Sequence, residues 1–204
     1  GRCFAGNTVL LACCDVIIAT KDSTIGMGGP AMIEGGGLGV YTPEEVGPMS
    51  FQVPNGVVDI LVEDEAEAVA VAKKYLSYFQ GSVDSWESSD QRLLRHVVPE
   101  NRLRLYDMRD VISTIADVDS VLEVREKFGI GIITSFIRIE GKPMGVIANN
   151  PHHLSGAIDS DGADKGARFL KLCDAFDIPI LSLMDCPGLM VGPEVEATAL
   201  VRHS

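Results

Sequence analysis

The chain has 204 residues, of which 46% are hydrophobic and 23% charged, an ordinary globular composition with room for one large or two small domains. Its formal net charge of −12 argues against binding to nucleic acid or anionic lipid, because both depend on phosphate contacts to Lys and Arg. The longest apolar stretch, Val9 to Cys14, is too short to form a membrane span.

The cysteines and the two ends of the chain bear on its compartment and completeness. The five cysteines are an odd number without CxxC spacing, and no secretory signal is visible. A reducing compartment is therefore expected, either the cytoplasm or the mitochondrial matrix of a eukaryote. The apolar pattern after Pro193 is still running at Ser204, so we expect a fragment of a longer polypeptide.

The sequence of the first part of the chain predicts short helices and short strands in alternation. Apolar periodicity, β-branched residues and capping residues indicate helices over 6–13, 43–46 and 64–79, and strands over 16–20, 24–27 and 57–62. The stretch 26–39 is rich in glycine, which favours a flexible loop over any regular element.

Residues 81–101 break this pattern with serines, acids and the single Trp86. The segment is the best candidate for a linker, and the alternative is an ordered surface excursion packed by Trp86. We accordingly expect three parts: residues 1–82 as the end of one domain, 83–100 as a linker, and 101–204 as the start of a second domain.

The second part predicts longer elements. After a helix at 111–115, two strands at 130–139 and 143–148 are joined at Glu140-Gly141-Lys142, which is typical of a hairpin. A loop over 149–159 leads into a helix at 161–176, with Asp159 or Ser160 as its cap, and then into a buried strand at 178–184.

Two islands of sequence resemble the biotin-dependent acyl-CoA carboxyltransferases, the beta subunits of acetyl- and propionyl-CoA carboxylases. One is Gly1-Arg2-Cys3-Phe4-Ala5-Gly6, and the other runs from Ala148-Asn149-Asn150-Pro151 through Gly156-Ala157-Ile158-Asp159 to Asp185-Cys186-Pro187-Gly188. The resemblance implies an α/β, crotonase-like (ClpP/crotonase) ββα spiral fold, with parts of two tandem domains in this chain.

The resemblance also implies the chemistry. Such enzymes move a carboxyl group from carboxybiotin to the α-carbon of an acyl-CoA, and backbone amides stabilise the enolate. It implies biotin carried on a partner protein or domain, a biotin carboxyl carrier and a biotin carboxylase as partners, acyl-CoA as substrate, and a homo-oligomer. The family's second amide pair is expected to lie beyond this chain, so the fragment should be inactive alone.

By the same resemblance, Ala5 and Gly6 match the first amide pair and are the predicted catalytic residues, although Phe4 and Asn7 depart from the family's small residues. Predicted substrate-binding residues are Gly28 and Gly29 near the acyl pocket, and Asn149, Asn150, Gly156 and Ala157 on the loop that approaches CoA or biotin. The alternatives are a plain helix N-terminus, a flexible loop and a tight turn, respectively.

Other chemistries find less support in the sequence. No metal site is predicted, because the adjacent His152 and His153 point apart in an extended chain and no third ligand has a characteristic spacing. Cys186 has no His partner that the sequence can place beside it. Neither Gly-rich nucleotide motif is satisfied. A CoA site would need local cations, for which the candidates are Arg2, Lys21, Lys142, Lys165 and Arg168.

Two other functions stay open at this point. A biotin-dependent acyl-CoA decarboxylase subunit runs the same transfer in the opposite direction and shares these motifs. A non-catalytic carboxyltransferase paralogue with an assembly function would explain Phe4 and Asn7. The acyl chain length is not readable from these residues.

Overall fold

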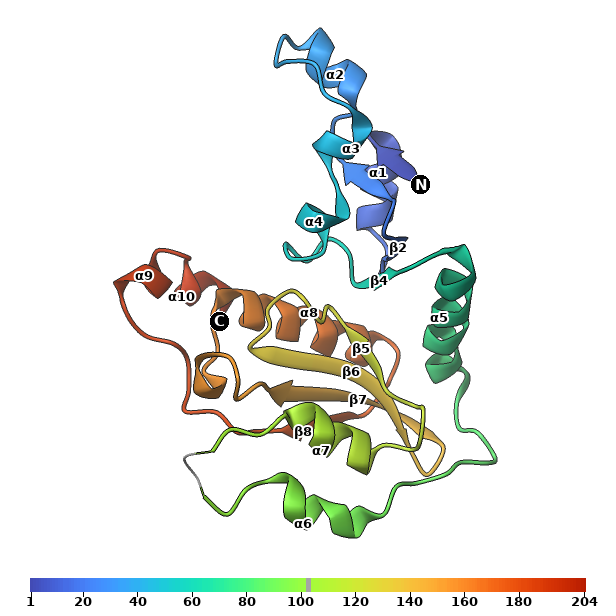
Figure 1. The fold of residues 1–204 in the computed structure, drawn as a ribbon, viewed down its shortest axis with the longest axis vertical. Helices are drawn as coiled ribbons and strands as arrows, with labels where there is room; N and C mark the ends of the chain where they lie inside the picture. The colour runs from blue at the N-terminus through green and yellow to red at the C-terminus, as the bar shows by residue number, and fades with distance from the viewer. Residues whose placement is uncertain (102–103) are drawn as a thin grey trace. The chain divides into compact units, whose positions relative to one another are not determined.

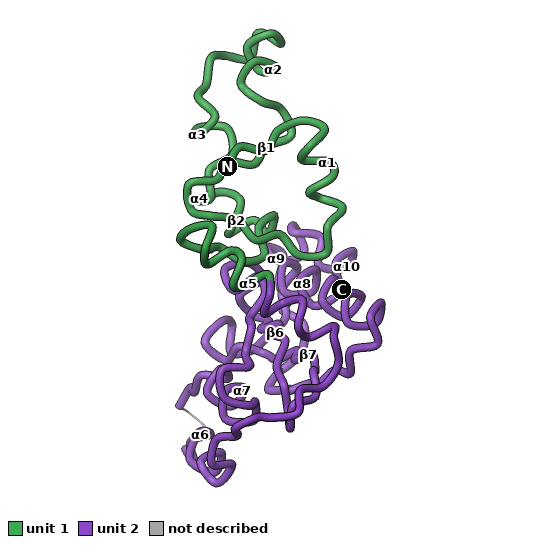
Figure 2. Tube along the Cα trace, turned by 90° about the vertical axis from the view of Figure 1, so that its right-hand side faces the viewer, with its two compact units in different colours: residues 1–72 green, residues 73–204 purple. Residues whose placement is uncertain are grey.

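The computed structural model describes residues 1–101 and 104–204, which form two compact units, Gly1–Ala72 and Lys73–Ser204 (Figure 2). Helix α5 (Glu65–Ser77) begins in the first unit and ends in the second. Within the described ranges, no helix has both the length and the apolar character that crossing a membrane requires. The domain limits expected from the sequence stay a prediction.

The N-terminal unit is built on two pairs of short parallel strands. Strand β1 (Arg2–Phe4) pairs with β3 (Thr24–Gly26), and β2 (Ile18–Thr20) pairs with β4 (Ile60–Val62). The helices of this unit that precede α5 are α1 (Gly6–Ala12), α2 (Pro30–Gly35), α3 (Pro43–Val46) and α4 (Met49–Gln52). Its buried apolar cluster is formed by Ile17, Ala19, Ile25, Met49 and Val58.

Most elements predicted for this unit are confirmed, but helix α4 was not predicted, and two further differences appear. The flexible loop predicted for 26–39 is wrong, because α2 occupies its middle. Pro30 stands at the first helical position, where its missing N–H costs nothing, and the glycines flank the helix instead of interrupting it. Strand β1 was not predicted, since its three residues depend on pairing with β3 far along the chain.

The C-terminal unit contains a four-stranded sheet in the order β5 (Leu122–Val124), β6 (Ile132–Ile139), β7 (Lys142–Asn149), β8 (Ile180–Leu183). The β6–β7 pair is the predicted hairpin, and β8 lies parallel to β7. The helical elements of this unit that follow α5 are η1 (Tyr78–Gln80), η2 (Gln91–Leu93), α6 (Leu94–Val97), α7 (Met108–Ile115), η3 (Leu154–Gly156), α8 (Ser160–Ala175), α9 (Pro193–Glu196) and α10 (Leu200–His203).

Helices α7 and α8 cover opposite faces of this sheet (Figure 1). Side chains alternate along a strand, so Ile133 and Ile137 of β6 pack with Ile112 of α7 in one cluster. Phe136 points to the other face and packs on Phe169 of α8, with ring centroids 5.1 Å apart. Strand β6 is buried on both faces, and its polar residues Thr134, Ser135 and Arg138 are buried together with its apolar ones.

The tip of the hairpin is held by a buried guanidinium. Arg138 is 7% exposed and donates hydrogen bonds to the carbonyl oxygens of Gly81 (2.9 Å), Gly141 (2.6 Å) and Ser77 (2.7 Å). The Asp117 carboxylate accepts the Gly141 N–H at 2.7 Å. The end of α5, the turn after it and the hairpin are thereby joined through one side chain.

The segment predicted as a linker has several contacts with the hairpin and α7. The Val83 N–H donates to the Gly141 carbonyl at 3.1 Å, and the Gln91 side chain donates to the Thr114 carbonyl at 2.6 Å. A Cβ on Gly141 would stand 3.2 Å from the Trp86 ring. These contacts fit the alternative of an ordered surface excursion, and the use of the segment as a domain linker stays a prediction.

Replacing Arg138 with Met should lower the free energy of unfolding by about 3 kcal/mol, because three buried carbonyl groups lose their donor. Urea denaturation of the purified protein measures the loss. Lys171→Met changes an exposed cation and should leave the value within about 0.5 kcal/mol. Equal stability of the two variants would contradict the assignment.

The buried Lys165 side chain should make the stability of the protein depend on pH. Its side chain on α8 is 1% exposed, Nζ has no hydrogen-bond partner among the described residues, and burial lowers its pKa from 10.5 to about 8. Between these values the unfolded state binds more protons than the folded state, so the free energy of unfolding should rise with pH.

From pH 7.5 to 9.5 this contribution is about 2 kcal/mol. It should be present in the unmodified protein and in Lys171→Met, and absent from Lys165→Met. Urea titrations at the two pH values give the comparison. An identical rise in Lys165→Met would show that other groups cause it.

Candidate active site

Parallel pairing of β1 with β3 brings the two predicted sites of the N-terminal unit together. Phe4 is the register partner of Gly26, and the Ala5 N–H donates to the Met27 carbonyl at 2.9 Å. The predicted pair Ala5–Gly6 therefore lies next to the stretch that contains Gly28 and Gly29. Their assignment to catalysis and substrate binding stays a prediction.

Phe4 fills the space between these two segments. A Cβ on Gly26 would stand 3.3 Å from its ring, and one on Gly29 would stand 3.4 Å from the Phe4 Cβ. A Cβ on Gly6 would meet nothing within 4 Å. Phe4 thus packs against the glycine stretch and leaves the surroundings of Gly6 open.

The backbone at Ala5 sets the direction of the amides that follow. Ala5 has φ 56° and ψ −128°, a conformation that residues other than glycine seldom adopt and that requires support from its surroundings. Its own N–H is bonded to Met27, whereas the N–H groups of Gly6 and Asn7, at the start of α1, have no acceptor among the described residues. The amides available to a ligand are therefore those of Gly6 and Asn7.

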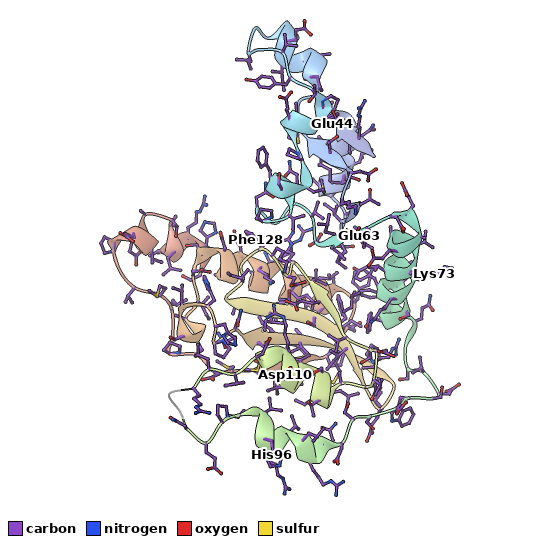
Figure 3. The ribbon with its side chains drawn as sticks, viewed as in Figure 1. Glu44, Glu63, Lys73, His96, Asp110 and Phe128 are labelled. Carbon is purple, nitrogen blue, oxygen red and sulfur yellow. The ribbon has the colours of Figure 1, made fainter. Side chains whose placement is uncertain are left out.

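Most of the cations predicted as candidates for a CoA site are paired with carboxylates or buried. Arg2 is paired with Glu44 of α3 at 2.8 Å, and Lys21 is paired with Glu63 (Figure 3 labels both carboxylates). Lys165 is buried, so it cannot reach a phosphate at the surface. Lys142 is exposed on the hairpin.

In the C-terminal unit the carboxyl ends of β7 and β8 lie at one edge of the sheet. The loop 149–159 follows β7, and Asp185 follows β8. Asn149 Nδ2 donates to the Gly156 carbonyl at 3.0 Å, and the Gly156 and Ala157 N–H groups donate to the carbonyls of His153 (2.9 Å) and Leu154 (3.0 Å). The four predicted residues of this loop are thus gathered at one place, with these donors used inside the loop.

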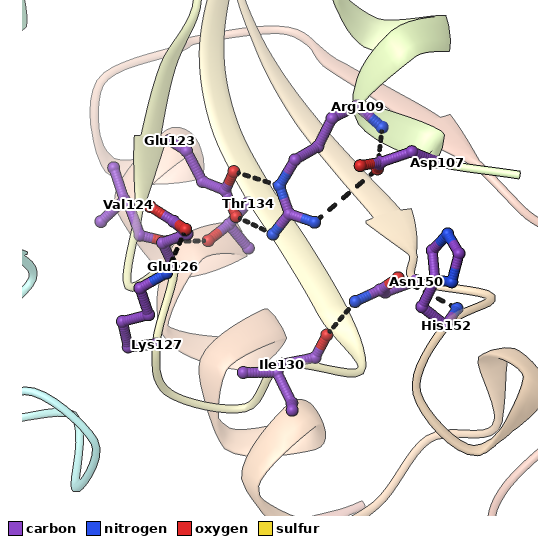
Figure 4. Close-up of polar contacts among 10 residues, drawn as sticks. All are labelled: Asp107, Arg109, Glu123, Val124, Glu126, Lys127, Ile130, Thr134, Asn150 and His152. Atoms are coloured by element: carbon purple, nitrogen blue, oxygen red, sulfur yellow. Dashed lines mark hydrogen bonds and ion pairs between the residues drawn. The ribbon is translucent and has the colours of Figure 1, made fainter.

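Asn150 fastens the same loop to the beginning of β6. Its side chain donates to the Ile130 carbonyl at 2.8 Å and accepts the His152 N–H at 3.1 Å, as Figure 4 shows. Its own N–H donates to the Gly131 carbonyl at 2.9 Å. Asn150 is 7% exposed, so in this arrangement it shapes the loop. Whether Asn149, Asn150, Gly156 and Ala157 bind substrate stays a prediction.

The conformation of this loop depends on Gly156. It follows Leu154 and Ser155, which also have positive φ, and its own φ is 84°. A Cβ on Gly156 would lie 2.3 Å from the Asp185 carbonyl oxygen. The close approach joins the loop to the strand-end turn, and the Ile158 N–H extends the junction by donating to the Gly188 carbonyl at 3.1 Å.

Tyr106 is a residue at this edge that the sequence did not reveal. Its hydroxyl donates to Asp185 Oδ2 at 2.8 Å. Burial and this hydrogen bond raise the pKa of Tyr106 to about 12, so the phenol stays protonated as a donor at neutral pH. Asp185 is thus fixed from two sides, by Tyr106 at its carboxylate and by Gly156 against its carbonyl group.

His153 and Asp159 form a hydrogen-bonded pair, with His153 Nε2 2.8 Å from Asp159 Oδ2. The other Asp159 oxygen accepts the Gly162 N–H at 2.8 Å, so Asp159, one of the two caps predicted for the α8 helix, is the one used. In the part of the chain that the structure describes, no three His, Cys, Asp or Glu side chains are placed to hold a metal ion.

The whole chain, residues 1–204, matches the carboxyl transferase domain family and belongs to it. It is similar to a single-chain, multi-domain long-chain acyl-CoA carboxylase, with 60% identity and a TM-score of 0.97 over 100% of this chain and 21% of that chain. It is also similar to the hexameric transcarboxylase 12S solved with methylmalonyl-CoA and methylmalonic acid bound, with 32% identity and a TM-score of 0.85 over 100% of this chain and 41% of that chain.

A curated relative is the methylmalonyl-CoA decarboxylase alpha subunit of Veillonella parvula, 31% identical over 214 residues, which cover 100% of this chain and 42% of that protein. The chain spans only about two fifths of the length of the curated relatives it matches, for example 40% of the methylmalonyl-CoA carboxyltransferase 12S subunit of Propionibacterium freudenreichii subsp. shermanii. The carboxyltransferase family and the crotonase-like α/β fold expected from the sequence are both confirmed.

Gly156→Ala should destabilise the C-terminal unit by about 2–4 kcal/mol, because the new Cβ clashes with the Asp185 carbonyl and strains a left-handed backbone. Gly188→Ala is the matched control: its φ is also positive, at 130°, but a Cβ there meets nothing within 4 Å. Denaturant titration should show a clearly larger loss for Gly156→Ala. Equal losses would mean that backbone strain alone, without the contact to Asp185, accounts for the effect.

Proposed function

We propose that the protein is the carboxyltransferase component of a biotin-dependent acyl-CoA carboxylase. It moves a carboxyl group from carboxybiotin to the α-carbon of an acyl-CoA. The family membership of the whole chain supports this activity, and the similarity to an acyl-CoA carboxylase at 60% identity supports the substrate class.

The observation that carries the proposal is the pair of free amides at Gly6 and Asn7. The chemistry needs donors aimed at an oxygen on which negative charge develops when the thioester α-proton leaves. The strained Ala5 turns its own N–H toward Met27 and presents the next two at the start of a helix, where the backbone dipole also favours an anion. We assign the enolate oxygen to these amides, a shift of one residue from the pair Ala5–Gly6.

The remaining predicted residues shape the substrate sites in this proposal. Gly28 and Gly29 belong to the stretch on which Phe4 packs, at the border of the acyl pocket. Asn149, Asn150, Gly156 and Ala157 hold the loop that faces carboxybiotin or CoA. The proposed partners are a biotin carboxyl carrier and a biotin carboxylase, and the proposed assembly is a homo-oligomer, in line with the hexamer described for transcarboxylase 12S.

A decarboxylase subunit is the second candidate function. The similarity to a methylmalonyl-CoA decarboxylase alpha subunit favours it, since the same donors would stabilise the same enolate when the carboxyl group leaves the acyl-CoA. The non-catalytic paralogue is less well supported, because Phe4 packs on Gly26 and Gly29 and does not cover Gly6.

Gly6→Pro in the complete protein should lower kcat/KM for carboxyl transfer by about 100- to 1,000-fold, because it removes one oxyanion donor. Proline is well suited to the first position of a helix, so folding should be retained. Transfer of labelled carboxylate from carboxybiotin to acetyl-, propionyl- and longer acyl-CoAs measures the effect and identifies the acyl group.

Gly6→Ala is the control, because it keeps the N–H and its Cβ has free space. It should retain activity within a few-fold, and light scattering should show the same assembly for both variants. Normal turnover by Gly6→Pro would remove this amide from the mechanism.

A further inference from the structure

The His153–Asp159 pair is a polar feature of the loop 149–159 that the proposed function does not yet use. The His153 and Asp159 side chains are 26% and 25% exposed. Asp159 is anchored by its cap on α8, through the bond from the Gly162 N–H. The position of the carboxylate that holds the imidazole is therefore set by the helix.

The imidazole is also fixed from a second side. A Cβ on Gly131 would lie 2.9 Å from His153 Cδ2 and 3.8 Å from Nε2, so this edge of the ring lies against the backbone that leads into β6. The Cδ2–Nε2 edge is therefore committed to Gly131 and Asp159, and the side chain as a whole is 26% exposed. Nδ1 has no hydrogen-bond partner among the residues the structure describes.

The pairing with Asp159 also determines whether Nδ1 donates or accepts a hydrogen bond. An ionised carboxylate only accepts hydrogen bonds, so Nε2 carries the proton of this contact. In the neutral ring Nδ1 then holds a lone pair and acts as an acceptor. The backbone N–H groups of Gly156 and Ala157 and the side-chain amides of Asn149 and Asn150 are donors already bonded within the protein.

We propose that His153 is a substrate-positioning residue whose Nδ1 accepts a hydrogen bond from an N–H group of the bound substrate. Two parts of the proposed substrates carry such a group, the ureido ring of biotin and the pantetheine amides of CoA. The inference rests on the proposed function, because that function supplies these two ligands. His153 acts by orientation, and no proton transfer is assigned to it.

Two substitutions in the complete enzyme separate the two ring nitrogens. His153→Gln places an amide nitrogen near the position of Nε2, so the contact with Asp159 is kept while the acceptor at Nδ1 is lost. His153→Asn places its amide oxygen near the position of Nδ1, so the acceptor is kept while the contact with Asp159 is lost. His152→Gln is the matched control, because the neighbouring side chain is exposed and only its backbone N–H makes a bond with Asn150.

Equilibrium dialysis with biocytin and with acetyl-CoA measures binding by each variant. His153→Gln should weaken binding of one of the two ligands by about five- to tenfold, the worth of one hydrogen bond, and His153→Asn should recover most of that loss. The ligand affected identifies the source of the N–H. An effect on biocytin alone assigns the ureido ring, and an effect on acetyl-CoA alone assigns the pantetheine arm.

Unchanged dissociation constants for both ligands in His153→Gln, or an equal change in His152→Gln, would overturn the inference. Failure of the unmodified enzyme to bind either ligand would also overturn it. Binding by the unmodified enzyme without carboxyl transfer in either direction would contradict the proposed function and leave the contact of His153 standing. The two failures are therefore distinguishable.

Discussion

The guanidinium of Arg138 is the contact on which the C-terminal unit depends. One buried cation satisfies three carbonyl groups from the end of α5, from the turn after it and from the hairpin tip. Because Asp117 holds the same tip, the register between β6 and β7 is fixed at its closed end. A slip of one residue would exchange the faces of every side chain in the pair, so this clamp also decides which residues emerge at the open end, where Asn149 and Asn150 begin the candidate site.

In both units the candidate site depends on backbone conformations that residues other than glycine seldom adopt. At Ala5 the unusual dihedral angles free the Gly6 and Asn7 amides, and at Leu154 to Gly156 three successive positive φ values fold the loop onto Asp185. Neighbouring contacts stabilise the strained backbone in each case. Phe4 packs on the glycine stretch, and the Asn150 side chain bonds to the residues that lead into β6. Strained backbone of this kind needs stabilising contacts from its surroundings. This explains why the Asn149 and Asn150 side chains bond to the protein itself.

The sequence was most informative where the signal is local. The β6–β7 hairpin follows from the two predicted strands on either side of Glu140-Gly141-Lys142, and the sequence offered Asp159 or Ser160 as the cap of α8, of which the structure shows Asp159. Contacts between distant residues were not readable: Tyr106 meets Asp185 across 79 positions, and the Ala5 N–H turns to Met27 only because β1 pairs with β3. Lys165, a candidate cation from its charge, lies instead on a buried face of α8. The resemblance supplied the family and a prediction for the region of each site, whereas the free amides and the His153–Asp159 pair are visible only in the three-dimensional structure.

The proposed chemistry also explains why carboxylase and decarboxylase subunits can share this fold. Amides that stabilise an enolate lower the barrier in both directions, since the same transition state is crossed whether the carboxyl group arrives or leaves. The amides of Gly6 and Asn7 carry no preference for direction, and neither does an acceptor such as His153 Nδ1 that orients a ligand. Direction then has to come from the supply of carboxybiotin or carboxylated acyl-CoA by the partners, which places the distinction between the two functions outside the residues of this site.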